Sequence, residues 1–165
     1  KNIAQQPWFS NTLFVFVADH GFRYTKESNE ILREIRIPLF VYDPRDSTGK
    51  REGQVVKQLD IVPSVLDKLR YPGPFTSFGG SFYRPAAGFS VNKIFGVHQY
   101  VDSVSLIGFS PEQDKLLYYY AFPKDSLLRN NLLPLKSTEA AQKIRRLKAF
   151  NQQAVNRLAE NRLDR

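Results

Sequence analysis

The chain has 165 residues, of which 42% are hydrophobic and 13% aromatic, and 24 basic residues against 16 acidic ones give a net charge of +8. This composition is that of a globular domain with a sizeable core, which excludes a disordered segment. Cysteine is absent, which excludes disulfides, thiolate metal sites and a cysteine nucleophile within the sequence. No apolar run approaches the roughly 20 residues that cross a bilayer.

The positive charge is uneven along the chain. Residues 1–82 carry 11 basic and 9 acidic residues, a net +2, whereas residues 83–165 carry 13 and 7, a net +6. A basic second half is consistent with binding to nucleic acid, anionic lipid headgroups or a phosphorylated substrate, and equally with a solvated surface, which is the default interpretation. Methionine is also absent, and we expect the chain to be a piece of a longer protein.

An apolar segment ends in three residues that suit a metal site. The run Thr12–Val17 has no polar alternation, which predicts a strand covered on both faces, as in a parallel sheet. Asp19 and His20 follow at its C-terminal end, where ligands bind in open α/β sheets. A carboxylate oxygen beside an imidazole nitrogen suits a divalent transition metal or zinc, and Gly21 permits a sharp turn. We therefore predict that Asp19 and His20 are metal ligands.

An ordinary turn is the alternative for the same tripeptide. In a turn, Asp19 accepts hydrogen bonds from nearby backbone N–H groups and His20 is merely exposed. On the tripeptide alone the turn is the favoured interpretation. The polar residues 22–34 that follow are consistent with a lid over the site and equally with a solvated connector.

The next two elements favour an α/β fold. Residues 36–43, RIPLFVYD, predict a second strand, which Pro38 restricts to an edge position or to pairing from Leu39 on. Residues 58–69, QLDIVPSVLDKL, predict a helix with Asp60 as N-cap and a proline in the first turn. Alternation of strand and helix is typical of α/β domains.

The second half predicts a small sheet and a helix. After an irregular connection, residues 89–95, 99–109 and 115–122 predict about three antiparallel strands, with Tyr118, Tyr119 and Tyr120 as strand and core residues. His98 lies in such a run without a close carboxylate, and we expect it to be structural or exposed.

A long amphipathic helix is predicted at the C-terminal end. Residues 127–135 read as a loop that ends at Pro134, and residues 137–163 show helical spacing of apolar side chains. Ser137 or Thr138 is the expected cap. We expect the helix to cover the appended sheet and to leave a basic side in solvent.

Four segments in order, PWFSNTLFVFVADHG, IPLFVYDPR, QLDIVPSVLDKL and FTSFGGSF, give the chain a family resemblance. It resembles the C-terminal part of the sulfatase and lipoteichoic acid synthase-like branch of the alkaline phosphatase superfamily. The resemblance implies an α/β fold, the C-terminal part of an alkaline-phosphatase-like sandwich. Within it, residues 1–83 would be the end of the catalytic domain, and residues 84–165 an antiparallel subdomain and long helix in the same fold unit.

The resemblance also implies a chemistry. Proteins of this family use a Thr, Ser or formylglycine nucleophile and a bound metal ion to transfer or hydrolyse phosphoryl or sulfuryl esters. Carried over, it places Asp19 and His20 on an adjacent pair of metal ligands, with manganese the first choice and calcium, zinc or magnesium the others. No catalytic residue maps onto the chain, so the nucleophile would lie upstream and this piece would be inactive alone.

These implications give three hypotheses. The leading one is part of a phosphoglycerol or phosphoethanolamine transferase or a sulfatase-like hydrolase, with the transferase preferred because His follows Asp. Its partners would be an anionic phosphate or sulfate ester, including a lipid headgroup, and the N-terminal remainder of the same protein, on the periplasmic or cell-surface side of a bacterial membrane. The second is a non-catalytic module that binds anionic lipid or glycan through the basic half. The third, nucleic-acid binding by charge, is the least favoured.

Overall fold

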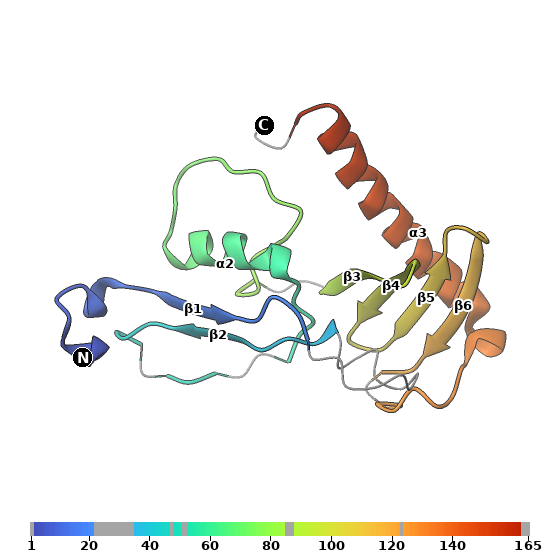
Figure 1. Cartoon of the computed structure of the whole chain (residues 1–165), viewed down its shortest axis with the longest axis horizontal. Coiled ribbons are helices and arrows are strands. Elements are labelled where there is room, and N and C mark those ends of the chain that lie inside the picture. The colour runs from blue at the N-terminus through green and yellow to red at the C-terminus, as the bar shows by residue number, and fades with distance from the viewer. Residues whose placement is uncertain are drawn as a thin grey trace. The chain divides into compact units, whose positions relative to one another are not determined.

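The computed structural model describes residues 2–21, 35–46, 48–50, 53–84, 88–122 and 124–162. Contacts group the chain into two compact units, residues 1–53 and 54–165, and each is described by itself (Figure 1). The α/β class, the small antiparallel sheet and the C-terminal helix agree with the prediction. The predicted division at residue 83 stays a prediction, and the predicted lid at residues 22–34 falls outside the described residues.

The first unit is built on a two-stranded ribbon. Two short 3₁₀ turns, η1 (Ile3–Gln5) and η2 (Phe9–Asn11), precede strand β1 (Phe14–Val17), which pairs with β2 (Leu39–Tyr42). β2 begins directly after Pro38, because proline has no N–H to give to the ladder. The prediction that pairing starts at Leu39 is therefore confirmed.

The prediction of a parallel strand covered on both faces is wrong for this pair. The two strands run antiparallel, with Phe16 opposite Phe40, and these rings are 57% and 65% exposed. Because side chains alternate along a strand, Phe14, Phe16, Phe40 and Tyr42 share one face, and valines and a leucine occupy the other. The uninterrupted apolar run thus reflects an aromatic face and an aliphatic face, a pattern that does not distinguish parallel from antiparallel pairing.

The second unit opens with a capped helix. The 3₁₀ turn η4 (Gln58–Asp60) leads into α2 (Ile61–Lys68), with Asp60 as N-cap and Pro63 in the first turn, as predicted. The buried Asp60 carboxylate accepts the backbone N–H of Lys57 at 3.0 Å and that of Gly80 at 2.9 Å. The capping residue therefore also holds the loop that follows the helix.

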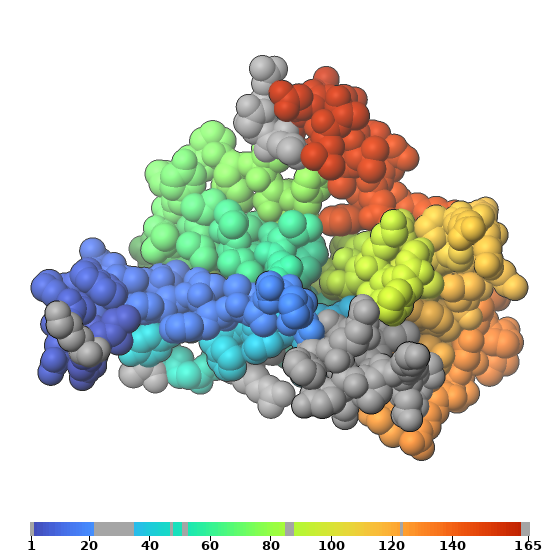
Figure 2. Space-filling view, in the orientation of Figure 1, coloured from blue at the N-terminus to red at the C-terminus, as the bar shows by residue number. Residues whose placement is uncertain are grey.

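Hydrogen bonds connect that loop to α2 along the length of the helix. Ser64 Oγ accepts the N–H of Phe82 at 2.9 Å, and the Asp67 carboxylate accepts Ser81 Oγ–H and the Arg84 guanidinium, both at 2.6 Å. α2 and the loop, both green, form one continuous body of atoms in Figure 2. Gly79 in this loop lies so close to the Leu59 carbonyl that a Cβ there would collide with it.

A four-stranded antiparallel sheet follows, in the order β3-β4-β5-β6. Its strands are β3 (Phe89–Ile94), β4 (Val97–Asp102), β5 (Leu106–Ser110) and β6 (Lys115–Tyr120). The predicted strand at residues 99–109 is wrong because a turn divides it: Asp102 Oδ1 accepts the backbone N–H groups of Val104 at 3.0 Å and Ser105 at 2.8 Å. The chain reverses there, so this stretch supplies two strands.

Helix α3 (Leu133–Ala159) lies along one face of this sheet (Figure 1). Ala140, Ile144 and Leu147 on the helix are buried against Tyr100, Ile107, Phe109 and Tyr119 of the sheet, which confirms that the helix covers it. Phe150 continues the contact, with its ring centroid 5.9 Å from that of Phe89. Among the described residues, no helix has the length and apolarity of a membrane span.

The predicted cap of this helix is wrong, and its predicted start at residue 137 is only the start of the part that follows a kink. α3 begins at Leu133, four residues before Ser137, and Pro134 lies in its first turn, where a missing N–H costs little. The start is held by Asn131, whose side-chain oxygen accepts the N–H of Leu133 and that of Tyr119, both at 3.0 Å. Lys136 has non-helical dihedral angles and marks a kink after this first turn.

Candidate metal site at the end of β1

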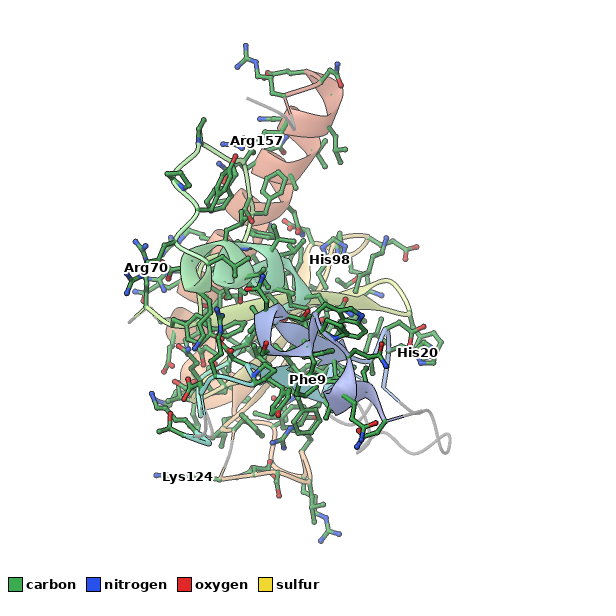
Figure 3. The ribbon with its side chains drawn as sticks, turned by 90° about the vertical axis from the view of Figure 1, so that its left-hand side faces the viewer. Phe9, His20, Arg70, His98, Lys124 and Arg157 are labelled. Carbon is green, nitrogen blue, oxygen red and sulfur yellow. The ribbon has the colours of Figure 1, made fainter. Side chains whose placement is uncertain are left out.

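The two predicted ligands lie together in the first unit. Asp19 and His20 lie one residue after the end of β1, and Asp19 Oδ1 is 3.7 Å from His20 Nε2. Their side chains are 89% and 80% exposed, and Figure 3 shows His20 at the periphery of the ribbon. Because ligand oxygens and nitrogens bind a transition metal at about 2.0–2.2 Å, two atoms at this separation are able to contact one ion.

The imidazole of His20 is oriented by the residue after it. His20 Nδ1 is 2.9 Å from the carbonyl oxygen of Gly21. In the tautomer that makes this hydrogen bond, Nδ1–H donates to the carbonyl and Nε2 carries the lone pair. In metal-binding histidines, the ring nitrogen that does not bind the metal typically donates such a hydrogen bond. Because this partner is a backbone carbonyl, the pattern of side chains in the sequence could not predict it.

The turn alternative describes part of the same geometry. Asp19 Oδ1 accepts the backbone N–H of His20 at 2.9 Å, and His20 is exposed. This hydrogen bond fixes the carboxylate next to the imidazole, so the turn itself brings the two side chains together. The turn and the ligand pair are therefore compatible.

The pair by itself is smaller than the donor set of a metal site. In the described ranges no group of three or more His, Cys, Asp or Glu residues could hold an ion. The carboxylate oxygen and the imidazole nitrogen fit a divalent cation chemically, yet structural and catalytic sites take at least three or four ligands. Further ligands would have to come from residues other than those described.

Asp43, which follows the second strand, does not join the pair. Val17 lies opposite Leu39, and Phe14 lies opposite Tyr42, so Asp43 is at the far end of the antiparallel ribbon from Asp19. Its carboxylate binds the Arg45 guanidinium in a bidentate manner, at 3.0 and 3.1 Å, and this hydrogen bonding raises the pKa of Arg45.

His98, the other histidine, has a structural contact in the second unit. Its Nδ1 is 3.0 Å from the side-chain nitrogen of Asn151 on α3. Burial, and then the charge of Lys93, lowers the pKa of His98. This position agrees with the structural interpretation drawn from the sequence.

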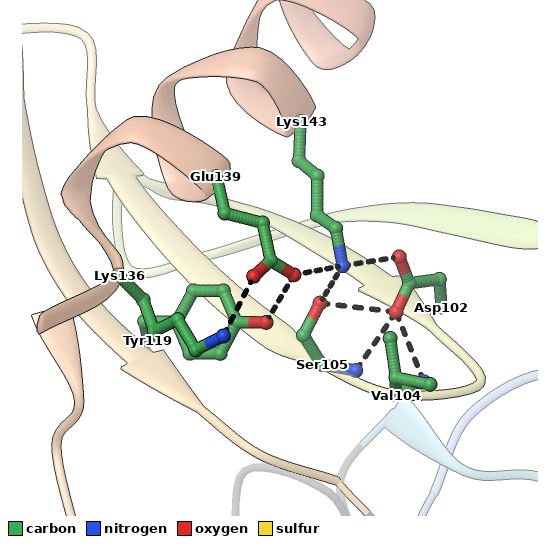
Figure 4. A network of polar contacts seen from close by, with 7 residues as sticks. All are labelled: Asp102, Val104, Ser105, Tyr119, Lys136, Glu139 and Lys143. Carbon is green, nitrogen blue, oxygen red and sulfur yellow. Dashed lines mark hydrogen bonds and ion pairs between the residues drawn. The ribbon is translucent and has the colours of Figure 1, made fainter.

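A polar network in the second unit was not predicted (Figure 4). Lys143 Nζ lies 2.8 Å from Asp102 Oδ2 and 3.2 Å from Glu139 Oε1, and Tyr119 Oη–H donates to Glu139 at 2.6 Å. The hydrogen bond from Tyr119 and the two lysines outweigh burial and lower the pKa of Glu139 to about 2. The spacing of Glu139 and Lys143, four residues apart on a helix, was the available signal.

The interactions in this network favour the ionised forms of its acidic and basic groups. Burial disfavours the charge of Lys143, but hydrogen bonds with Asp102 and Glu139 outweigh it and raise the pKa of Lys143. Burial also opposes ionisation of Asp102, and the hydrogen bonds from Lys143, Val104 and Ser105 outweigh it and lower that pKa. The network therefore joins α3 to the sheet through ion pairs.

Comparisons with known proteins agree with this fold. Residues 4–71 match the sequence model of the sulfatase family. An arylsulfatase of Clostridium perfringens is 33% identical over 67 residues, which are 35% of this chain and 14% of the relative. The chain thus spans about one seventh of that relative's length.

Solved structures extend the similarity to nearly the whole chain. A 2-O GAG sulfatase has a TM-score of 0.71 and 18% identity over 96% of this chain and 40% of its own. A putative sulfatase from Bacteroides thetaiotaomicron gives 0.69 and 19% over 94% and 39%. A protein in the alkaline phosphatase superfamily from Vibrio parahaemolyticus gives 0.67 and 16% over 90% and 37%.

The family match and the fold point to the same group of proteins. The matched residues 4–71 contain β1, Asp19, His20, β2 and α2. The fold shared with the solved structures also includes the four-stranded sheet and the helix after it. The chain is thus similar in sequence to sulfatases over residues 4–71, and its fold is similar to solved structures of sulfatases and of a protein in the alkaline phosphatase superfamily.

Proposed function

We propose that the chain is part of a metal-dependent hydrolase of sulfate esters, in which Asp19 and His20 are two of the metal ligands. The observation that supports this is the 3.7 Å separation of Asp19 Oδ1 and His20 Nε2, within the segment that matches the sulfatase family. The protein's nucleophile and remaining ligands would come from residues not described.

Each residue of the pair has a separate role in this proposal. Asp19 supplies negative charge, and the hydrogen bond from the His20 N–H positions its carboxylate. His20 supplies the ring nitrogen Nε2, in the tautomer whose Nδ1–H donates to the Gly21 carbonyl. When bound, a divalent ion would offset the charge of the ester and lower the pKa of an attacking hydroxyl group.

Sulfate esters are the substrates that the comparisons favour. The curated relative is an arylsulfatase, and one of the similar structures is a 2-O GAG sulfatase. The transfer of phosphoglycerol or phosphoethanolamine stays a prediction from the sequence, and so does a location on the outer side of a bacterial membrane. A non-catalytic module is less favoured, because the segment with the metal pair is the one that matches an enzyme family.

The exposed aromatic face of the first unit supports a further partner, the remainder of a sulfatase domain. Trp8, Phe16, Phe40 and Tyr42 are all exposed on or beside the ribbon. An apolar surface of this kind typically marks an interface. The chain spans at most 40% of the similar solved structures, so these proteins contain much additional polypeptide.

A paramagnetic titration tests the metal assignment on the chain itself. Mn²⁺ is added to the ¹⁵N-labelled protein, and amide signals near the ion broaden even when binding is weak. We expect selective broadening at Asp19, His20 and Gly21, which is lost in D19N and in H20Q. H98Q is the matched control, because it removes the only other imidazole.

Two results would contradict the assignment. One is broadening of the same strength at residues 19–21 in D19N or H20Q as in the unmodified chain. The other is an equal loss in H98Q. Repeating the titration with Zn²⁺, Ca²⁺ and Mg²⁺ as competitors ranks the ions, because a tighter ion relieves the broadening at a lower concentration.

A further inference from the structure

A cavity of about 190 Å³ lies within the second unit, between the start of that unit, strand β4 and helix α3. Its lining residues are Gln54, Val55, Gly88, Tyr100, Asp102, Ser103 and Arg146. We propose that this cavity binds a small organic oxyanion that carries hydroxyl groups, such as a sugar acid. The proposal does not depend on the metal pair, which lies in the first unit.

The charges around the cavity leave one cation in surplus. Glu139, Lys143 and Arg146 follow one another on the same side of α3, at positions i, i+4 and i+7. Lys143 pairs with Asp102 and Glu139, and Lys136 pairs with Glu139 at 3.2 Å, so two carboxylates offset two lysines. Within the described ranges Arg146 has no ion pair, and its guanidinium is the uncompensated charge at the cavity.

The carboxylate in the cavity wall does not offset Arg146. Asp102 Oδ2 binds Lys143 Nζ at 2.8 Å, and Asp102 Oδ1 accepts the N–H groups of Val104 and Ser105 and the Ser105 hydroxyl. Both oxygens are thus engaged away from Arg146. A cavity with a satisfied carboxylate and a surplus guanidinium favours a negatively charged guest.

Hydroxyl groups supply the rest of the recognition. Tyr100 is only 2% exposed and lines the cavity, and its hydroxyl makes no hydrogen bond with the part of the chain that the structure describes. A hydroxyl that bonds to no protein group is able to donate a hydrogen bond to a ligand or accept one from it. Ser103 adds a second hydroxyl. The guanidinium fork fits a planar carboxylate or a tetrahedral oxyanion.

The cavity is small and partly open to solvent. Its volume is below the roughly 300–1,000 Å³ of drug-sized sites, so it fits one small molecule. The Gly88 backbone lies so close to the Val55 carbonyl that a Cβ there would collide with it. Gln54 is held by a hydrogen bond from its amide to the Phe82 carbonyl.

The test is a titration of the 165-residue chain with D-glucuronate, in the presence of EDTA so that no metal ion takes part. The amide signals of Val55, Gly88 and Ser103 report on the cavity wall. We expect saturable shifts with glucuronate and none with D-glucose, its neutral counterpart. R146Q should weaken binding by roughly tenfold, the loss of one charge-assisted pair, and Y100F should weaken it severalfold.

R145Q is the matched control. Arg145 is the neighbouring exposed arginine of α3 and does not line the cavity, so its loss removes the same charge without touching the site. Equal weakening in R145Q and R146Q, equal shifts with glucose, or the absence of saturation would each overturn the proposal. H20Q should bind glucuronate unchanged, which separates this test from that of the metal pair.

A titration with inorganic sulfate separates the binding of the oxyanion from the binding of the ligand's hydroxyl groups. If the hydroxyl groups contribute, glucuronate binds more tightly than sulfate, and Y100F reduces the affinity for glucuronate alone. Sulfate that binds as tightly as glucuronate would overturn the recognition of a hydroxylated ligand. Glucose 6-sulfate, compared with glucuronate, then shows which oxyanion the Arg146 fork prefers.

Discussion

Lys143 on α3 and Asp102 at the end of β4 form an ion pair of 2.8 Å that joins the helix to the sheet. Their side chains are only 15% and 16% exposed, so both charges are largely removed from solvent. Removing one member of a buried pair leaves the other without a partner, at a typical cost of roughly 3–5 kcal/mol. K143M should therefore lower the free energy of unfolding by roughly 3 kcal/mol, measured by urea denaturation.

Lys148 provides the comparison for this prediction. It lies on the same helix and pairs with Asp114 at the same 2.8 Å, but these side chains are 50% and 81% exposed. An exposed pair contributes about 0–1 kcal/mol, so K148M should cost about 1 kcal/mol or less. An equal cost for both substitutions would show that burial of the Lys143 pair has no energetic consequence.

Stability should fall in acid because of Glu139. The hydrogen bond from Tyr119 lowers the pKa of Glu139 in the folded chain to about 2, from an ordinary value of 4.5. A group with a lowered pKa stabilises the fold above its unfolded pKa, and this contribution is lost as the pH falls from 4.5 to about 2. The unfolding midpoint in urea should thus decrease across this window.

E139Q isolates the contribution of Glu139 to the acid response. The variant should be less stable at neutral pH and should lose less stability than the unmodified chain between pH 4.5 and about 2. Some acid sensitivity should remain, since Arg84 and Ser81 also lower the pKa of Asp67 to about 2. Identical slopes for the two proteins would mean that the Glu139 carboxylate titrates in the same way when folded and unfolded.

The glycine pair in the loop after α2 gives a matched test of backbone contact. A Cβ on Gly79 would collide with the carbonyl of Leu59, whereas a Cβ on Gly80 would meet no atom within 4 Å. G79A should destabilise the chain by roughly 1–3 kcal/mol, the usual cost of overpacking. G80A should change stability by less than about 0.5 kcal/mol. Chemical denaturation of both variants measures the difference.

The aromatic face of the ribbon should bind hydrophobic dyes. Phe40 is the most exposed of its rings, so F40T, which replaces it with another residue that favours strands, should reduce the fluorescence of bound ANS. Unfolding free energy should change by less than about 1 kcal/mol, since little buried surface is lost. A loss of several kcal/mol would instead indicate that Phe40 is packed in the folded chain.

The sequence predicted the local elements better than their partners. Asp60 and Pro63 marked the start of α2, and Pro38 marked the start of β2, because a cap and a missing N–H act on their own backbone. The direction of β1 pairing was mispredicted, because parallel and antiparallel strands both tolerate an uninterrupted apolar run. The start of α3 was missed because Asn131 acts from outside the helical pattern.

For the candidate site too, the sequence predicted the local arrangement of neighbouring residues but not their contacts with other parts of the backbone. Asp19 and His20 are neighbours in sequence, so the prediction that their side chains lie close together needed only the strand before them. The role of the Gly21 carbonyl and the separation of Asp43 from the pair depended on backbone geometry and strand direction. Their assignment as metal ligands stays a prediction.

Asn131 also determines where the four-stranded sheet could grow. Its side chain accepts the N–H of Tyr119 and donates to the carbonyl of Leu117 at 3.3 Å, while the N–H of Leu132 donates to the carbonyl of Tyr119 at 2.8 Å. These bonds occupy backbone groups on the outer edge of β6, the last strand of the sheet. An occupied edge offers no template to a strand from another molecule, so self-association of this sheet would have to proceed through β3.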